Sequence, residues 1–206
     1  MRFIHKWAYV SAKYIQENRN QDHIKRRILY FGFQSVYGDF IKLFLIAIIS
    51  AVLQSFMATI MLTASFAILR MNAGGFHLNS EGKCIFTSVF LTVIPGKAIC
   101  TVNSFDKISA IFIYACIFVL SFYCIYKYAP KDCSNNPIEG SNILLFKHNS
   151  IKSLIILFSI SILFYFFGLP VLALAIIVGI LVEVFTITPI GYKIINKVFP
   201  QRFYKR

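Results

Sequence analysis

The sequence predicts an all-α, polytopic integral membrane protein with about six inserted segments and amphipathic helices at both termini. Of its 206 residues, 58% are hydrophobic and only 14% are charged, whereas soluble domains are about 45–50% apolar and about 25% charged. Long uncharged stretches alternate with basic clusters, as expected for apolar spans joined by interfacial loops. This composition excludes a soluble globular domain and a disordered chain. We therefore expect one membrane domain over residues 1–206.

Residues 1–39 are expected to form amphipathic helices on the cytoplasmic face of the membrane. An apolar stripe with helical spacing, flanked by basic residues, runs along the first of them: Phe3, Trp7, Val10 and Tyr14. Such a helix lies in the plane of the interface. A polar break follows at residues 18–22, where Asp22 can cap a second helix.

Four later stretches are almost free of charge and long enough to cross a membrane, which takes about 20 apolar residues. They give a hairpin at 40–69 and spans at 85–103, 108–126, 153–168 and 170–188. The last two are separated by a turn at Gly168-Leu169-Pro170. Residues 127–152 form a polar cytoplasmic loop, and residues 189–206 form a basic tail that begins with an interfacial helix.

Residues 40–69 could instead form one long helix. With residues 1–39 in the cytoplasm, a hairpin leaves 19 basic residues inside and two outside, whereas a single helix moves 11 to the wrong side. The positive-inside rule therefore favours the hairpin and places both termini and residues 70–84 in the cytoplasm. Each limb of about 14–15 residues spans only about 21 Å of a roughly 30 Å core. The bilayer must thin locally, or the first limb must begin earlier, near Phe33.

The net charge of +13 indicates contact with anionic lipid headgroups. Because the basic residues lie between apolar runs and not on a soluble face, we expect no nucleic-acid partner. The five cysteines, at 84, 100, 116, 124 and 133, form no Cys-x-x-Cys pair. We therefore expect no metal site, no disulfide and no cofactor.

The cytoplasmic loop at residues 70–84 carries the candidate chemistry, because His77 and Cys84 lie seven residues apart in it. On one straight helix their side chains would be about 10 Å apart along the axis, which is too far for proton transfer. The alternative is a chance pair, in which Cys84 is a small hydrophobic residue at the start of a span.

A sharp turn at Gly74 and Gly75 removes this distance problem. If the next helix starts at Asn79 or Ser80, the imidazole can return over its first turn, where Cys84 lies. The positive end of the helix dipole and the neighbouring lysine favour a thiolate, although partial desolvation at the membrane opposes it. The neutral imidazole can then accept the thiol proton and later return it to a leaving amine.

Supporting roles around this pair remain open. Asn79, Ser80 and Glu81 are close in sequence, but we interpret Glu81 as a carboxylate of the first helical turn and not as a residue that orients the histidine. Arg70 is either a positive-inside anchor or a group that binds a carboxylate of the substrate. Glu183 is the single acid in the last apolar block. It is either a functional intramembrane acid or a residue that reaches the interface.

The sequence resembles the AgrB family of accessory gene regulator membrane proteases. The resemblance covers essentially the whole chain, including the basic N-terminus, the apolar hairpin and the Ala129-Pro130 loop. Its most specific part is the motif formed by Arg70, Gly74-Gly75-Phe76-His77 and Cys84.

This resemblance implies a bacterial, multi-pass membrane cysteine endopeptidase with His77 and Cys84 as its catalytic pair. It further implies cleavage of a small AgrD-like precursor peptide through an acyl-enzyme. A nucleophile within the peptide would resolve that intermediate to a cyclic thiolactone or lactone signal for quorum sensing. A homodimer sharing a peptide groove is compatible with a bundle of this size.

Two other classes of function remain open on the residues alone. A small transporter or peptide-export component would place ionisable residues at mid-membrane and break its spans with Gly and Pro. Glu183 and the turn at 168–170 are the features of that kind. A non-catalytic membrane anchor would tolerate loss of the Cys84 thiol.

Overall fold

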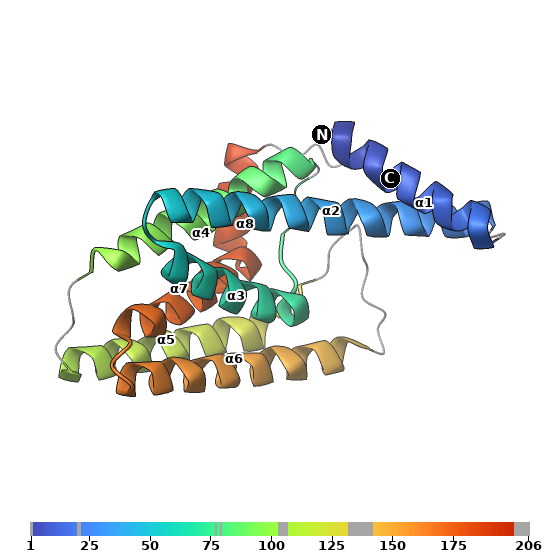
Figure 1. The fold of residues 1–206 in the computed structure, drawn as a ribbon. Coiled ribbons are helices and arrows are strands. Elements are labelled where there is room, and N and C mark those ends of the chain that lie inside the picture. The colour runs from blue at the N-terminus through green and yellow to red at the C-terminus, as the bar shows by residue number, and fades with distance from the viewer. Residues whose placement is uncertain are drawn as a thin grey trace.

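A computed structural model describes residues 2–19, 22–76, 78, 80–102, 107–131 and 142–199, and every named element in these ranges is an α-helix (Figure 1). In chain order the helices are α1 (Arg2–Arg19), α2 (His23–Val52), α3 (Phe56–Ala73), α4 (Glu81–Cys100), α5 (Lys107–Tyr128), α6 (Ile143–Phe166), α7 (Pro170–Ile187) and α8 (Pro189–Val198). The predicted all-α class is therefore confirmed.

The predicted membrane class is also confirmed. Within the described residues, five helices are long and apolar enough to cross a bilayer: α2, α3, α4, α6 and α7. The apolar part of α5, Phe112–Tyr128, is shorter. A bilayer core of about 30 Å corresponds to about 20 helical residues, and helices of 18 to 30 residues can meet that requirement with different tilts.

Helix α2 differs from the expected segmentation, because no boundary falls near residue 39. It begins after Asp22, whose carboxylate accepts a hydrogen bond of 2.6 Å from the backbone N–H of His23, and it continues without interruption to Val52. No proline lies within it, so nothing in the sequence stops the helix. The chain then turns through residues 53–55 into α3, with Gln54 at a φ of 54°. The helix before this turn is thus longer than about 15 residues, in line with the alternative that the first limb begins before residue 40.

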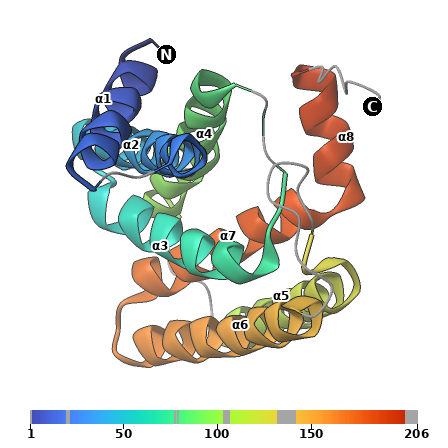
Figure 2. The ribbon, with the colours of Figure 1, turned by 90° about the vertical axis from the view of Figure 1, so that its right-hand side faces the viewer.

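Helices α3 and α7 form the middle layer of the molecule (Figure 2). Helices α2 and α4 lie on one side of this layer, and α5 and α6 lie on the other. Helix α7 contacts α3, α4, α5, α6 and α8, which makes it the most buried of the candidate spans. At Gly179 it approaches α3 so closely that a Cβ atom would overlap Ser65 and the carbonyl of Leu62. Small residues allow such close crossings in membrane bundles.

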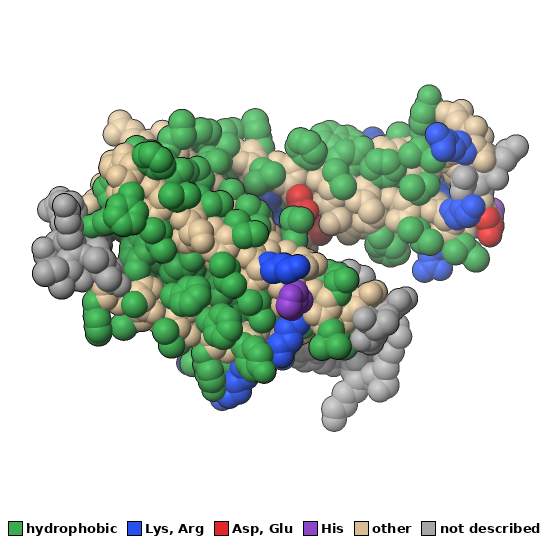
Figure 3. Space-filling model, turned by 90° about the horizontal axis from the view of Figure 1, so that it is seen from below, with side chains coloured by type: hydrophobic (Ala, Val, Ile, Leu, Met, Phe, Trp, Pro, Cys, Tyr) green, Lys and Arg blue, Asp and Glu red, His purple; other side chains and the backbone are tan. Residues whose placement is uncertain are grey.

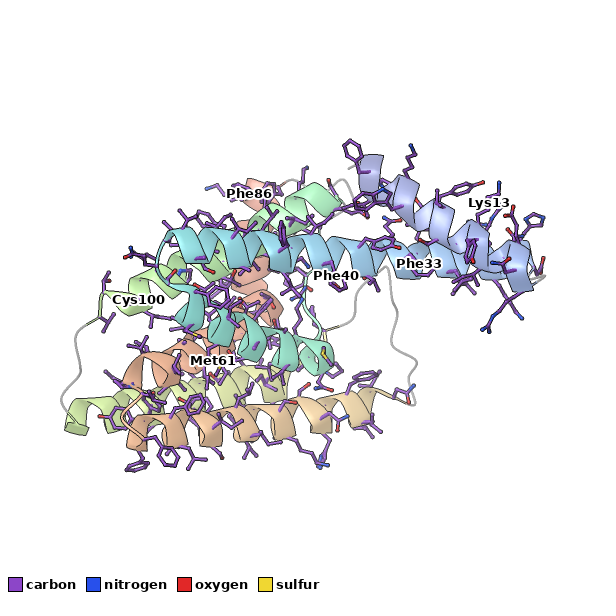
Figure 4. All side chains as sticks on the ribbon, in the orientation of Figure 1. Lys13, Phe33, Phe40, Met61, Phe86 and Cys100 are labelled. Carbon is purple, nitrogen blue, oxygen red and sulfur yellow. The ribbon has the colours of Figure 1, made fainter. Side chains whose placement is uncertain are left out.

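The outer surface of the bundle is apolar. Exposed aromatic side chains include Phe40 on α2 and Phe86 on α4 (Figure 4). Viewed from the side of α6, hydrophobic side chains cover most of the bundle and charged groups are sparse (Figure 3). Exposed large apolar area of this extent is typical of a surface that lipid covers.

Helix α1 packs along the N-terminal half of α2, which projects beyond the bundle (Figure 1). Its fully buried residues are Ile4, Ala8 and Ala12. The stripe that the sequence singled out is on another face and is exposed: Phe3, Trp7, Val10 and Tyr14. A helix with one face on α2 and an exposed apolar face fits the interfacial placement expected for it.

Candidate active site

The loop after α3 makes the sharp turn that the two glycines predicted. Helix α3 ends at Ala73, and Gly74 and Gly75 follow with φ values of 74° and 136°. Residues other than glycine rarely adopt these backbone conformations. The turn ends α3 at Ala73, and α4 begins only at Glu81.

Cys84 lies in the first turn of α4, as predicted. The helix begins at Glu81, and the backbone N–H of Cys84 donates a hydrogen bond of 3.0 Å to the carbonyl of Ser80. Ser80 is the N-cap residue in an extended conformation, so the helix starts one or two residues later than expected. The thiol therefore lies close to the positive end of the helix dipole.

The Cys84 side chain is partly exposed and packs against a small apolar cluster. The buried members of this cluster are Phe76, Leu78 and Ile195, and Tyr192 packs beside them. The cluster joins the loop before α4 to helix α8. Lys83 directs its ammonium group to the ring of Phe199, with 5.8 Å between the nitrogen and the ring centroid.

His77 and Asn79 lie outside the described residues, so the predicted proton transfer between His77 and Cys84 stays a prediction. The residues on either side of His77 are described. Phe76 and Leu78 are 9% and 8% exposed. The loop is thus anchored by buried side chains immediately before and after the predicted base.

Arg70 holds this loop by its backbone. The Nη2 group of Arg70 donates a hydrogen bond to the carbonyl oxygen of Phe76. The Nη1 group donates to the hydroxyl of Thr186 over 3.2 Å and lies 3.5 Å from the Oε2 atom of Glu183. The guanidinium also lies over the rings of Phe66 and Phe76, 5.5 Å and 5.8 Å from their centroids. Arg70 is therefore built into the fold, which a simple positive-inside anchor does not require.

Glu183 is fully buried in α7, inside the helical bundle. Its side chain is 0% exposed, and its Oε2 atom accepts a hydrogen bond of 2.8 Å from Thr186. Its other oxygen, Oε1, has no hydrogen-bond partner in the described part of the chain. Burying a carboxylate is costly unless it is paired, and Arg70 supplies the opposite charge.

Gly75 is required for a second reason, which the sequence did not reveal. A Cβ atom at this position would lie 2.5 Å from Nη1 of Arg70 and 2.8 Å from Oγ1 of Thr186. The glycine thus makes the turn and also leaves space for the charged side chain. The structure brings Arg70, Gly75 and Glu183 together, although Arg70 and Glu183 are 113 positions apart in sequence.

A second loop lies against the glycine turn. The backbone N–H of Lys131 donates a hydrogen bond of 2.8 Å to the carbonyl of Ala73, and Lys131 forms an isolated parallel bridge with Gly74. The ammonium group of Lys131 lies 5.3 Å from the ring centroid of Tyr192. The sequence marked this segment only as part of a polar loop that includes Ala129-Pro130. Nothing local predicts its partner, because the bridge uses backbone atoms.

Glu81 lies in the first turn of α4, as predicted. Its Oε2 atom lies 3.7 Å from Nε2 of His5, so the start of α1 is close to the start of α4. Among the described residues, no three His, Cys, Asp or Glu side chains are grouped to hold a metal ion.

The fold and site define a class: an all-helical, multi-pass membrane protein with a partly exposed thiol at the start of a span, preceded by a loop that the Arg70–Glu183 pair contacts. The chain belongs to the accessory gene regulator B (AgrB) family, whose model matches residues 8–187. This match confirms the resemblance drawn from residues 70–84.

Individual relatives agree with the family match. The chain is 28% identical over 182 residues to an accessory gene regulator protein B of Staphylococcus aureus (strain bovine RF122 / ET3-1), covering 88% of this chain and 92% of the relative. It is 27% identical over 192 residues to putative AgrB-like protein 2 of Clostridium perfringens (strain 13 / Type A), covering 87% and 89%. No solved structure matches the chain.

Proposed function

We propose that this protein is a membrane-embedded cysteine endopeptidase that removes the C-terminal part of a small, AgrD-like precursor peptide. Its family membership gives it a role in an accessory gene regulator system. The observation that carries the enzymatic proposal is the position of Cys84, partly exposed in the first turn of α4. The thiol lies beside a loop that is anchored on both sides of His77.

In the proposed first step, the Cys84 thiol transfers its proton to His77 and the sulfur attacks a precursor carbonyl. The peptide C–N bond breaks, and the imidazolium returns the proton to the leaving amine of the C-terminal fragment. The N-terminal part of the precursor stays on Cys84 as a thioester. Backbone N–H groups at the glycine turn or at the start of α4 are candidates to stabilise the oxyanion.

In the proposed second step, a thiol or hydroxyl within the bound peptide attacks the thioester. The new C–S or C–O bond closes a ring, and the Cys84 sulfur leaves and regains a proton. Exchange between thioesters is close to isoenergetic, so ring closure succeeds when water is excluded and the nucleophile is held near. Cys84 packs on one side against the apolar cluster of Phe76, Leu78 and Ile195, which supports water exclusion on that side.

The partners and orientation follow from the same proposal. The precursor peptide is the substrate, and the bilayer supplies anionic headgroups for the basic segments. The charge distribution favours a cell-membrane orientation with both termini and the 70–84 loop in the cytoplasm. A homodimer remains part of the proposal. Glu183 was the acid that favoured a transporter. Its ion pair with Arg70 accounts for this acid without a transport function.

The test is co-expression with a candidate precursor encoded nearby, followed by intact mass measurement of both proteins. We expect wild type to release the C-terminal fragment and to carry a thioester adduct. Cys84→Ala and His77→Ala should each abolish release while the protein still inserts. Cys100→Ala is the matched control, because this exposed thiol lies at the other end of α4. Normal cleavage by Cys84→Ala would contradict the proposal.

A further inference from the structure

We infer that Glu183 is a positioning residue for the proposed catalytic loop, acting through Arg70 with Thr186 as its second contact. This inference rests on the proposed function, because the loop that it positions carries His77. Glu183 does not contact the thiol in this scheme. It sets the place of the Arg70 guanidinium, and the guanidinium sets the place of the Phe76 carbonyl.

The geometry divides the Arg70 guanidinium between two tasks. Its Nη1 group faces α7, where it contacts Thr186 and Glu183. Its Nη2 group faces the loop, where it donates to the Phe76 carbonyl. Because the guanidinium is planar and rigid, fixing one nitrogen fixes the direction of the other. The acid in α7 is thereby linked to the backbone unit that immediately precedes His77.

Thr186 makes this arrangement specific. Its hydroxyl lies 2.8 Å from Oε2 of Glu183 and 3.2 Å from Nη1 of Arg70. The hydroxyl can accept from the guanidinium while it donates its one proton to this carboxylate or, over 2.9 Å, to the backbone carbonyl of Glu183. Both α7 residues lie at the end of the helix nearest the loop, three positions apart on neighbouring turns. A carboxylate held in this way leaves the guanidinium a single favoured orientation.

A purely structural ion pair would not need the contact to Phe76. Burial alone explains why Glu183 requires a cation, but the second nitrogen of Arg70 could have ended in solvent or on another side chain. It ends on the loop, and the lack of a Cβ atom at Gly75 leaves space for the Nη1 group of the same guanidinium. A misplacement of about 1 Å at a catalytic group costs about 100-fold in rate, so small shifts of this carbonyl are sufficient to matter.

The first experiment uses the isosteric variant Thr186→Val beside Thr186→Ser, with Asp39→Asn and Glu183→Gln. Thr186→Val and Glu183→Gln should each slow adduct formation on Cys84 at saturating precursor by at least about tenfold, because each weakens a hydrogen bond to a charged group. Precursor affinity should stay at the wild-type value, and membrane accumulation of Thr186→Val should stay there too, because this variant keeps both charges of the pair. Thr186→Ser keeps the hydroxyl and should retain the wild-type rate. Asp39→Asn removes an exposed acid and is the charge control.

The second experiment separates positioning from stability by reversing the charges in the double variant R70E/E183R. The reversed pair restores opposite charges between α3 and α7, but residue 70 then has no donor for the Phe76 carbonyl. We expect accumulation to recover relative to R70E alone, while cleavage stays at least about tenfold below wild type. Recovery of accumulation and cleavage together would overturn the inference, because a structural pair would then suffice.

The two proposals fail in different ways. If cleavage by wild type does not depend on Cys84, the proposed function fails. If cleavage depends on Cys84 but Thr186→Val and Glu183→Gln form the adduct at the wild-type rate, the positioning role fails and the proposed function stands. A fall in precursor affinity without a fall in the rate at saturating precursor would also overturn the positioning role, because Glu183 and Arg70 would then serve substrate binding. If Glu183→Gln accumulates poorly, the positioning role is judged on Thr186→Val alone, because that variant retains the charges of Arg70 and Glu183.

Discussion

At the scale of single residues, the backbone at position 75 imposes two structural requirements that only glycine meets together. Its φ of 136° excludes ordinary side chains, and its α-carbon faces the Arg70 guanidinium and the Thr186 hydroxyl. Gly82, seven positions later in the first turn of α4, has neither constraint, since nothing lies within 4 Å of its Cβ position. The two glycines therefore form a natural comparison.

We expect Gly75→Ala to reduce Cys84-dependent cleavage at least about tenfold, because the methyl group displaces Arg70 and strains the turn by roughly 1–3 kcal/mol. Gly82→Ala should leave cleavage unchanged and should stabilise the helix by up to about 1 kcal/mol. The measurements are fragment release and thermal unfolding in detergent. Equal behaviour of the two variants would show that the space beside Arg70 is unimportant.

Asn72 tests whether the end of α3 needs its contact to α6. Its side-chain amide donates a hydrogen bond of 3.1 Å to the hydroxyl of Ser153. Asn72→Ala should lower the free energy of unfolding by about 1 kcal/mol, the usual value for one such bond. Because Arg70 and the glycine turn are untouched, cleavage at saturating precursor should remain at the wild-type rate. A large fall in that rate would place Asn72 in the site.

At the scale of the elements, helix α7 connects the packing of the bundle with the geometry of the site. This helix lies beside α3 in the middle layer and packs against α5 and α6, and its end nearest the loop supplies Glu183 and Thr186. The close crossing at Gly179 determines how near α7 lies to α3 and therefore whether Glu183 can reach Arg70. Packing in mid-membrane and the geometry of the site are thus connected through one rigid helix.

Replacement of Gly179 by Ala should separate α7 from α3 and lower stability by about 1–3 kcal/mol, because the added methyl group meets backbone as well as a side chain. Gly38→Ala in α2 is the control, since nothing lies within 4 Å of its Cβ position and alanine favours the helix by about 1 kcal/mol. Thermal unfolding in detergent measures both. A stable Gly179→Ala protein would show that the helices can adjust without cost.

At the scale of the whole molecule, the fold combines an apolar bundle with a projecting arm of α1 and the first half of α2 (Figure 1). The start of α1 returns to the start of α4 through His5 and Glu81. The proposed orientation places most of the basic residues in the cytoplasm. The orientation of the whole bundle then determines which compartment the site faces.

The two ends of α4 provide a test of that orientation. Cys84 and the exposed Cys100 are 16 residues apart on one helix, which separates them by about 24 Å along its axis. In variants that keep one of these cysteines alone, a membrane-impermeant thiol reagent should label Cys100 in right-side-out vesicles and Cys84 in inverted vesicles. Detergent should expose both. Labelling of Cys84 from outside would reverse the proposed orientation.

Several features could be read from the sequence because their causes are local. The uncharged stretches predict helical spans, since a backbone in lipid must satisfy its own hydrogen bonds. Gly74 and Gly75 predict the sharp turn after α3. Because the next helix begins a few residues after these glycines, Cys84 falls in its first turn. The exposed stripe of α1 follows from its helical spacing.

The sequence by itself therefore determined the membrane class, the all-helical fold, the glycine turn and the nucleophile as a candidate. Only the tertiary structure decided that α2 is one continuous helix, that Lys131 pairs with the glycine turn, and that Arg70 and Glu183 meet. Local patterns report what a residue prefers in its own helix. Pairing between residues 113 positions apart depends on how α3 and α7 cross, and that crossing is determined by the packing of all their neighbours at once.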